Sequence, residues 1–249
     1  MRKTIVMTAV LALLTLGAAA QNTFKGTVKY KVESTGQVAM QIPEEAATAE
    51  IKVLGDKLFT QSKIFVSSVV ECVLVQGLTA THCANLSQVL GFLRGQGSEF
   101  TYQGDGKLMV KETHKLSELD SLEIVDTEPG HFYYEYTSET KEIVGVTARK
   151  LLRHRYDEDG VDHPLEMWVC ETIGPRYNML FEGIKGMPLQ CTLDVGEGRA
   201  ITYTATEIVK GKVREVDFLL PDGYETISEE DFQTLTRELN EELELLQGE

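Results

Sequence analysis

The sequence is poor in positive charge. Its 249 residues include 24 Lys and Arg against 39 Asp and Glu, and the formal net charge at pH 7 is −15. An acidic chain is repelled by the phosphates of nucleic acid and by anionic membrane surfaces. We therefore expect no nucleic-acid partner, and we expect the charge to favour solubility.

Catalytic signatures are also missing. The chain has no GxSxG motif of serine hydrolases, no HExxH motif of zinc proteases and no glycine-rich phosphate loop. Paired carboxylates are abundant, but in so acidic a chain their presence discriminates nothing. The sequence therefore predicts a non-catalytic protein that needs no cofactor.

Long apolar runs are absent after the first twenty residues. Arg2 and Lys3 precede an apolar run over Ile5–Leu16, and small residues follow it. This order predicts a secretory signal peptide over residues 1–20, cleaved before Gln21. The run is shorter than the roughly 20 residues that span a bilayer. Without a cysteine after the cleavage position, no lipid anchor is expected. We predict a periplasmic or secreted protein with no transmembrane segment after cleavage.

If the protein is exported, we expect its four cysteines to form disulfides, because an oxidising compartment favours disulfides over free thiols. Cys72 and Cys83 flank a turn-like Gln-Gly pair, and Cys170 and Cys191 lie on successive predicted strands. We predict the pairs 72–83 and 170–191. Zinc held with His82 beside Cys83 is the alternative, but the spacing matches no short paired-ligand pattern.

Two weaker metal patterns surround one predicted turn. His154 and His163 flank this turn and could meet across a hairpin. The spacing of the acids near Gly160 matches part of the calcium-binding loop of EF-hands, but the full set of ligands is absent. These acids are Asp157, Asp159 and Asp162. Turn chemistry explains the same residues, so we predict no metal site.

Most of the remaining chain has the pattern of β-strands. Apolar and polar residues alternate from Phe24 to Val32, which predicts a strand with one buried face. Between Leu58 and Gln76 the run FVSSVVECVLV is apolar at successive positions, so both faces of this strand are expected to be covered. The stretch Lys141–Leu193 is typical of a β-meander. Further strands are predicted over 47–53, 100–103, 108–111, 131–136, 200–210 and 214–220. About ten or eleven antiparallel strands would curl strongly or close.

Two stretches have helical periodicity. Leu86, Val89, Leu90 and Leu93 fall at i, i+3, i+4 and i+7, and we expect this short helix to lie as a lid over the open face of the sheet. A second helix over 228–246 has an apolar stripe on an acidic surface. This stripe either packs on the flank of the domain or docks onto a partner. Residues 21–249 are predicted to form one domain.

A curled sheet beneath a short lid leaves a concave apolar space, where small hydrophobic ligands bind. The alternative is that side chains fill the interior completely. If a pocket exists, its predicted lining residues are Val66, Val70, Leu90, Leu93, Trp168 and Phe181.

Several short motifs carry a family resemblance. In chain order they are FKGTVKY (24–30), ETKEIVG (139–145), EMWV (166–169), GMPL (186–189) and FLLPDGY (218–224). Together they resemble exported Bacteroidetes proteins of the domain-of-unknown-function and GLPGLI-type groups, which are similar to LolA-like periplasmic lipoprotein carriers. The resemblance implies a mainly β fold, an unclosed β-barrel whose apolar concave face is partly covered by helices and holds acyl chains in the carriers.

These observations predict a periplasmic protein that binds a lipid, an acyl chain or another apolar ligand. The alternative is a cell-envelope component that binds a protein partner through the acidic C-terminal helix or through an exposed sheet edge.

Overall fold

The computed structural model describes residues 24–61, 69–98, 100–121, 132–156, 159–194 and 198–247. The predicted signal peptide and Val66 lie outside these residues. The strands of the described part are β1 (Lys25–Ser34), β2 (Thr48–Leu54), β3 (Lys57–Thr60), β4 (Val70–Gln76), β5 (Thr79–Asn85), β6 (Lys107–Thr113), β7 (Phe132–Ile143), β8 (Val146–Arg155), β9 (Leu165–Cys170), β10 (Met187–Asp194), β11 (Ala200–Lys210) and β12 (Glu225–Ile227).

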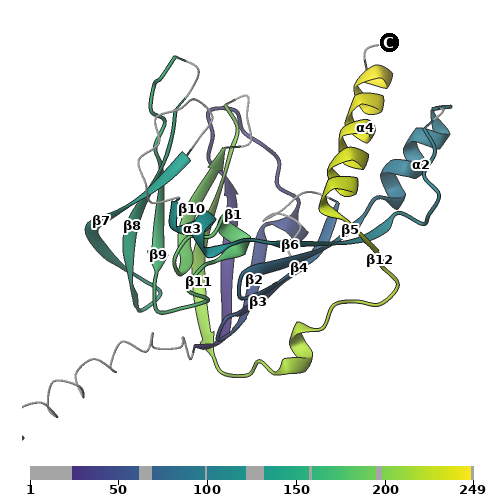
Figure 1. Cartoon of the computed structure of the whole chain (residues 1–249). Helices are drawn as coiled ribbons and strands as arrows, with labels where there is room; N and C mark the ends of the chain where they lie inside the picture. Colours follow the sequence, from purple (N-terminus) through teal and green to yellow (C-terminus); the bar gives the residue numbers. More distant parts are fainter. Residues whose placement is uncertain are drawn as a thin grey trace, which may run out of the picture.

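All of these strands join one curled sheet (Figure 1). Its order is β12-β6-β5-β4-β3-β2-β1-β11-β10-β9-β8-β7, so the sheet is open and ends at β12 and β7. Neighbours are antiparallel, except that β12 runs parallel to β6. The prediction of a mainly β fold with an unclosed, curled sheet is confirmed.

The inner face of the sheet carries the main apolar core. In β1, Val28, Tyr30 and Val32 are buried while the residues between them are exposed, as expected for a strand with one covered side. Across the sheet, the Tyr30 hydroxyl donates a hydrogen bond of 2.8 Å to the carbonyl oxygen of Pro188, at the start of β10. This bond satisfies a polar group that the core would otherwise leave unpaired.

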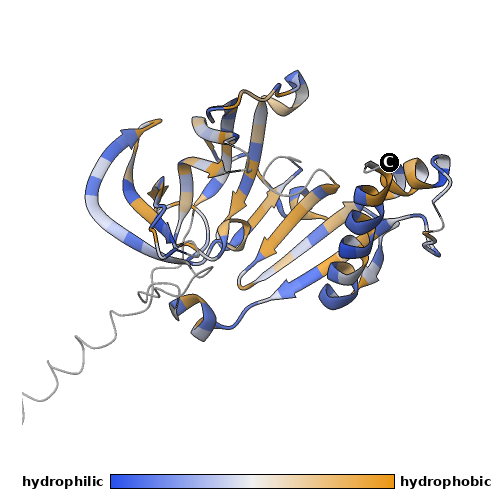
Figure 2. Ribbon diagram, turned by 90° about the horizontal axis from the view of Figure 1, so that it is seen from above, coloured by the Kyte–Doolittle hydropathy of each residue, from blue (hydrophilic) through white to orange (hydrophobic). Residues whose placement is uncertain are grey.

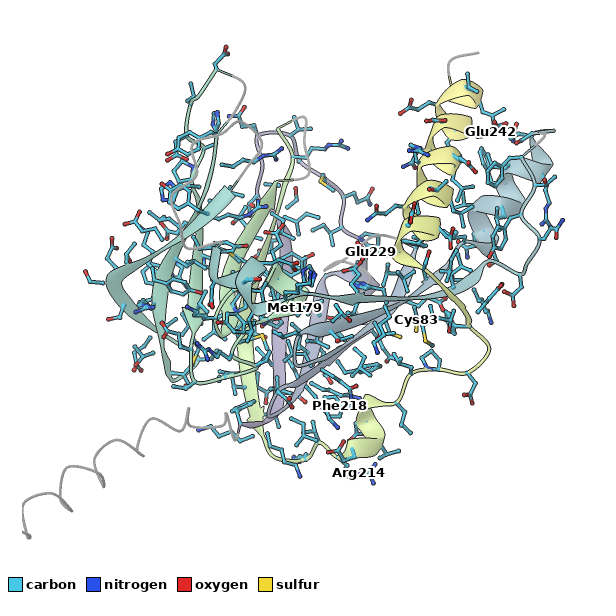
Figure 3. All side chains as sticks on the ribbon, in the orientation of Figure 1. Cys83, Met179, Arg214, Phe218, Glu229 and Glu242 are labelled. Atoms are coloured by element: carbon cyan, nitrogen blue, oxygen red, sulfur yellow. The ribbon has the colours of Figure 1, made fainter. Side chains whose placement is uncertain are left out.

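The connection between β9 and β10 fills much of the space over this inner face. We call residues 171–186 the inner segment; it contains the short helix η2 (Met179–Phe181). Its buried apolar residues belong to the same core cluster as the strands, and they are Ile173, Tyr177, Met179, Phe181 and Ile184. Leu119 of helix α3 (Leu116–Ser121) joins the same cluster. Figure 3 labels Met179 at the centre of the strands. The cover of the concave face is therefore a long loop.

A second cover lies on the outer face. Residues 211–224, which we call the outer strap, include the helix η3 (Glu215–Phe218) and bury Phe218 against Phe59 of β3, with 6.5 Å between the ring centroids. The strap covers Cys72 and Leu74 of β4, whose Val73 and Val75 belong to the inner core. The expectation that this apolar stretch is covered on both faces is confirmed for β4.

Two of the predicted strands are not strands in the structure. The segment 214–220 is no strand, because the Asp217 carboxylate accepts a 2.7 Å hydrogen bond from the Arg214 backbone N–H and favours a helical turn there. Figure 3 shows Arg214 and Phe218 on this turn. Likewise, residues 100–106 form a loop in place of the predicted hairpin strand, and β6 pairs with β5 and β12.

Helix α2 (Ser87–Gly95) packs against α4 (Glu229–Gln247) at the β12 end of the sheet, and the two stand side by side in Figure 1. Leu90 and Leu93 are buried in this cluster together with Leu235 and Leu239. The prediction that α2 lies as a lid over the open face of the sheet is therefore wrong. Helix α2 packs instead against the apolar stripe of α4, and the inner segment covers the concave face of the sheet.

The predicted C-terminal helix is present, and the Ser228 hydroxyl accepts a 3.1 Å hydrogen bond from the backbone N–H of Asp231, as expected of an N-cap. Figure 2 shows α4 as a largely hydrophilic helix broken by apolar residues. The apolar stripe of α4 packs against α2 of the same chain. The first of the two alternatives, packing on the flank of the domain, is therefore the one observed. No helix in the described ranges is long and apolar enough to cross a membrane.

The four cysteines are free thiols. Cys72 and Cys83 are directly opposite each other on β4 and β5, which places their Cα atoms within the roughly 4.4–6.8 Å that a disulfide needs. The hydrogen bond from the Cys72 thiol to Cys83 raises the pKa of Cys72. The predicted 170–191 pair is wrong, because Cys191 is opposite Met167, three positions from Cys170. Three positions along a strand span about 10 Å.

The α2–α4 contact gives a stability prediction. We expect Leu239→Ala to lower the free energy of unfolding by about 2–4 kcal/mol, because it leaves a cavity between the helices. Leu245→Ala is the matched control, since Leu245 is 68% exposed and its loss should change stability by less than about 0.5 kcal/mol. Urea denaturation measures both, and equal effects would contradict the packing of α4 against α2.

The strand register gives a redox prediction. After refolding in a glutathione redox buffer, we expect a disulfide between Cys72 and Cys83, while Cys170 and Cys191 stay reduced. Burial raises the pKa of the Cys191 thiol to about 12, so it is also a poor nucleophile. Mass spectrometry of proteolytic peptides identifies the crosslink, with Cys83→Ser as the control. A crosslink between Cys170 and Cys191 would show that the β9–β10 register is incorrect.

Candidate functional site

A cavity of about 210 Å³ lies between the inner segment and the inner face of β7 to β10. Its apolar wall consists of Leu165, Met167, Leu180, Phe181 and Leu193, and its polar wall consists of Tyr134, Arg153, Glu182 and Thr192. Mostly apolar walls with a few converging polar groups are typical of small-molecule sites. This cavity is the candidate site.

The strand register places the first row of the wall. Tyr134 of β7 is opposite Arg153 of β8, which is opposite Leu165 of β9. The next row contains Met167 of β9, opposite Leu151 of β8. Residues that are paired across antiparallel strands share a face, so these side chains project on the side where the inner segment lies.

The polar part of the site is a charged pair with a phenol. Arg153 Nη2 donates to Glu182 Oε1 at 2.9 Å, and Arg153 Nε lies 2.9 Å from Glu182 Oε2. The Tyr134 hydroxyl donates to Glu182 Oε2 at 2.8 Å. Burial, followed by the Glu182 charge, raises the pKa of Tyr134 well above its usual value. Tyr134 therefore stays protonated and remains a hydrogen-bond donor at any physiological pH.

The backbone of the inner segment is tightly turned where it supplies these groups. Glu182 has φ 54° and ψ 30°, a left-handed conformation that is uncommon outside glycine. It is followed by Gly183 at φ 81°, where an added Cβ would lie 2.4 Å from Leu119. A side chain at 183 would strain the backbone and would have to displace Leu119, so glycine suits this position.

Asn178 fixes this turn from within. Its side chain is completely buried. Its Oδ1 accepts from the Leu180 backbone N–H at 3.2 Å, and its Nδ2 donates to the Gly186 carbonyl at 3.0 Å. Its own backbone N–H donates to the Ile184 carbonyl at 2.7 Å. One buried amide thus closes the loop that presents Phe181 and Glu182.

Of the residues that the sequence predicted as lining, Phe181 is at the cavity. Val70 is buried in the main core without reaching the cavity, and Leu90 and Leu93 are between α2 and α4. Trp168 is next to Met167 on β9 and therefore faces the opposite side of the sheet. There its ring lies under Lys141 Nζ, 4.0 Å from the centroid, and its Nε1 donates to Glu166 at 2.7 Å.

Sequence reasoning missed the polar wall. A usable signal existed in LLRHR, where Arg153 follows Leu151 at the two-residue spacing of the buried face. An arginine at such a position needs a partner. Glu182 had no comparable signal, because its position depends on how a loop folds over the sheet.

A second polar cluster lies on the outer side of β8. His154 Nδ1 is 2.7 Å from Asp162 Oδ2, and His154 Nε2 is 3.1 Å from Glu135 Oε2. The ring stacks on Tyr133 with 4.5 Å between centroids. In the described residues no group of three or more His, Cys, Asp or Glu side chains is arranged to hold a metal ion. His154 thus links two strands and a loop through hydrogen bonds.

Comparisons with known proteins leave the family open. No known family model matches the sequence, and no curated protein matches it. Among solved structures, PNGF-II in space group P21 superposes with TM-score 0.46 and 11% identity over 84% of this chain, but this chain spans only 33% of that protein.

Two other structures are comparable in length. An uncharacterised conserved protein from Thermus thermophilus has TM-score 0.37 and 8% identity over 82% of this chain and 91% of its own. A LolA superfamily protein from Nitrosomonas europaea has TM-score 0.29 and 11% identity over 81% of this chain and 91% of its own. Similarities this weak assign neither a family nor a function.

The buried amide yields a prediction about the site. Asn178→Ala removes hydrogen bonds to Leu180 and Gly186 inside the core, so we expect a loss of about 1–3 kcal/mol in the free energy of unfolding. Gln233→Ala is the control, because it removes an exposed 3.0 Å bond to Glu229 and should cost less than about 0.5 kcal/mol. Chemical denaturation compares them, and a neutral Asn178→Ala would mean that the inner segment is not closed by this amide.

Proposed function

We propose that this chain is an exported, non-catalytic protein that binds a small apolar or amphipathic molecule in the cavity between the inner segment and β7 to β10. One observation carries the proposal. The inner segment and the inner face of the sheet leave between them a space of about 210 Å³ with an apolar wall and a cluster of polar groups. Tight packing of protein interiors makes such a space a candidate binding site.

The size of the cavity restricts the ligand. Pockets for drug-sized molecules measure roughly 300–1,000 Å³, so a space of about 210 Å³ suits a small molecule or one part of an acyl chain. Binding would be driven mainly by apolar burial, at about 25 cal/mol per Å² before the costs of association are subtracted.

The site of action that we propose is the periplasm or the cell exterior. The apolar run over residues 5–16, preceded by two basic residues, supports export. The ordered motifs, which resemble those of exported Bacteroidetes proteins, support an envelope role and a LolA-like type of cavity. Within this proposal a lipid or acyl chain is the first ligand class to test.

The second candidate function is binding of an envelope protein through a sheet edge. Strand β7 (Phe132–Ile143) is the end of the sheet order in the described part of the chain, and such an edge can accept another strand. Charged residues Glu135, Glu139 and Lys141 along β7 disfavour uncontrolled pairing. A partner strand that pairs with β7 would therefore need charges that complement these residues.

A neutral probe tests the cavity. We expect N-phenyl-1-naphthylamine, an apolar dye that fluoresces when it is buried, to bind the purified mature protein with one-site saturation. Leu165→Trp should weaken this binding by about tenfold or more, because the larger ring fills the space that the dye needs.

The matched control is Val161→Trp, which adds the same ring at a position that is 53% exposed and outside the cavity. It should leave dye binding unchanged. Equal binding by both variants would place the dye elsewhere. Mass spectrometry of lipids extracted from protein purified out of the periplasm then identifies any natural occupant, and a protein that binds no dye and carries no lipid would refute the proposed function.

A further inference from the structure

We propose that Arg153 and Tyr134 form a receptor for the carboxylate head group of an amphiphile, and that Glu182 occupies this receptor as an internal substitute. The inference rests on the proposed function and names the class of ligand: a linear carboxylate whose tail enters the apolar part of the cavity.

The first support is the geometry around Glu182. Two nitrogens of the Arg153 guanidinium each lie 2.9 Å from a different oxygen of one carboxylate. The Tyr134 hydroxyl adds a 2.8 Å hydrogen bond to Oε2. One guanidinium hydrogen bond, an ion-pair contact to the second oxygen and a phenol donor at that oxygen form a combination that suits a carboxylate.

The second support is the contrast between the receptor and its occupant. Tyr134 is only 5% exposed, and the Arg153 side chain is 20% exposed. Both project from neighbouring paired strands, which fix their spacing. The Glu182 side chain is 51% exposed and belongs to a loop residue at φ 54°. The donors are therefore built into the sheet, while the carboxylate is reachable from solvent.

The third support is the position of the receptor in the cavity. Arg153, Tyr134 and Glu182 share the cavity with Leu165, Met167 and Leu193. A carboxylate bound at Arg153 would therefore place its hydrocarbon tail against apolar side chains. Displacing Glu182 would lose its contacts with Arg153 and Tyr134, but water would solvate the released carboxylate, half of whose side chain is already exposed.

The competing explanation is that the ion pair only anchors the inner segment. The two explanations make different predictions for Glu182→Gln, which keeps the size of the side chain and removes its charge. If Glu182 competes with ligand, the variant should bind a carboxylate more tightly. If Glu182 only anchors the loop, the variant should lose stability and gain no affinity.

The experiment is a calorimetric titration of the mature protein with decanoate, decanol and decyl phosphate, which share a chain length and differ in the head group. We expect Glu182→Gln to bind decanoate about tenfold more tightly than the unaltered protein, with unchanged affinity for decanol. Tyr134→Phe and Arg153→Met should each remove the preference for decanoate over decanol. Thermal denaturation checks that every variant is folded, and Tyr134→Phe, which lacks one hydroxyl, keeps the test valid if Arg153→Met does not fold.

The outcomes separate the two proposals. Equal binding of decanoate and decanol by the unaltered protein and by Glu182→Gln would overturn the receptor and leave the apolar site intact. Preference for decyl phosphate over decanoate would overturn the assignment to a carboxylate. If neither decanol nor decanoate binds the unaltered protein or Glu182→Gln, the proposed function itself fails.

Discussion

The structure depends on keeping water from the inner face of a strongly curled, open sheet. A closed barrel would fill its own interior, but this sheet ends at β12 and β7 and needs a separate cover. The inner segment provides it, with buried side chains from Ile173 to Ile184 packed on the strands. Asn178 makes this possible, because it satisfies backbone groups that a buried loop would otherwise leave unpaired. The candidate cavity lies between this cover and strands β7 to β10.

Two other apolar surfaces are also shielded from water by a covering segment. The outer face of β3 to β5 is apolar around Phe59 and Cys83 and is covered by the outer strap, and α2 is covered by α4. Figure 3 places Cys83, Glu229 and Glu242 along this side of the molecule. The Ser98 hydroxyl donates to Glu242 at 2.6 Å, which ties the end of α2 to α4. Each cover is amphipathic, so each exposes its charged residues to solvent.

The local pattern of apolar residues predicted most strands correctly, but it did not predict which segments cover the sheet. Alternation identified β1, β2 and the strands of the meander, and continuous hydrophobicity identified β4 as buried on both sides, because each pattern reports burial directly. The same patterns could not assign partners. Leu90 and Leu93 were recognised as buried, but their partner was α4, far along the chain. Trp168 was predicted to line the cavity, but it follows Met167 directly on β9 and therefore lies on the opposite face of the sheet. The site residue Glu182 depends on loop geometry that no local pattern encodes.

The position of β1 in the middle of the sheet links chain order to folding. One neighbour, β2, follows it directly, but the other is β11, and the ion pair between Lys29 and Glu207 joins residues 178 positions apart. Contacts between such distant segments form slowly, because a long loop must close first. The central strand therefore lacks one of its two partners until residues 200–210 have been made, so the two halves of the sheet can join only late in synthesis.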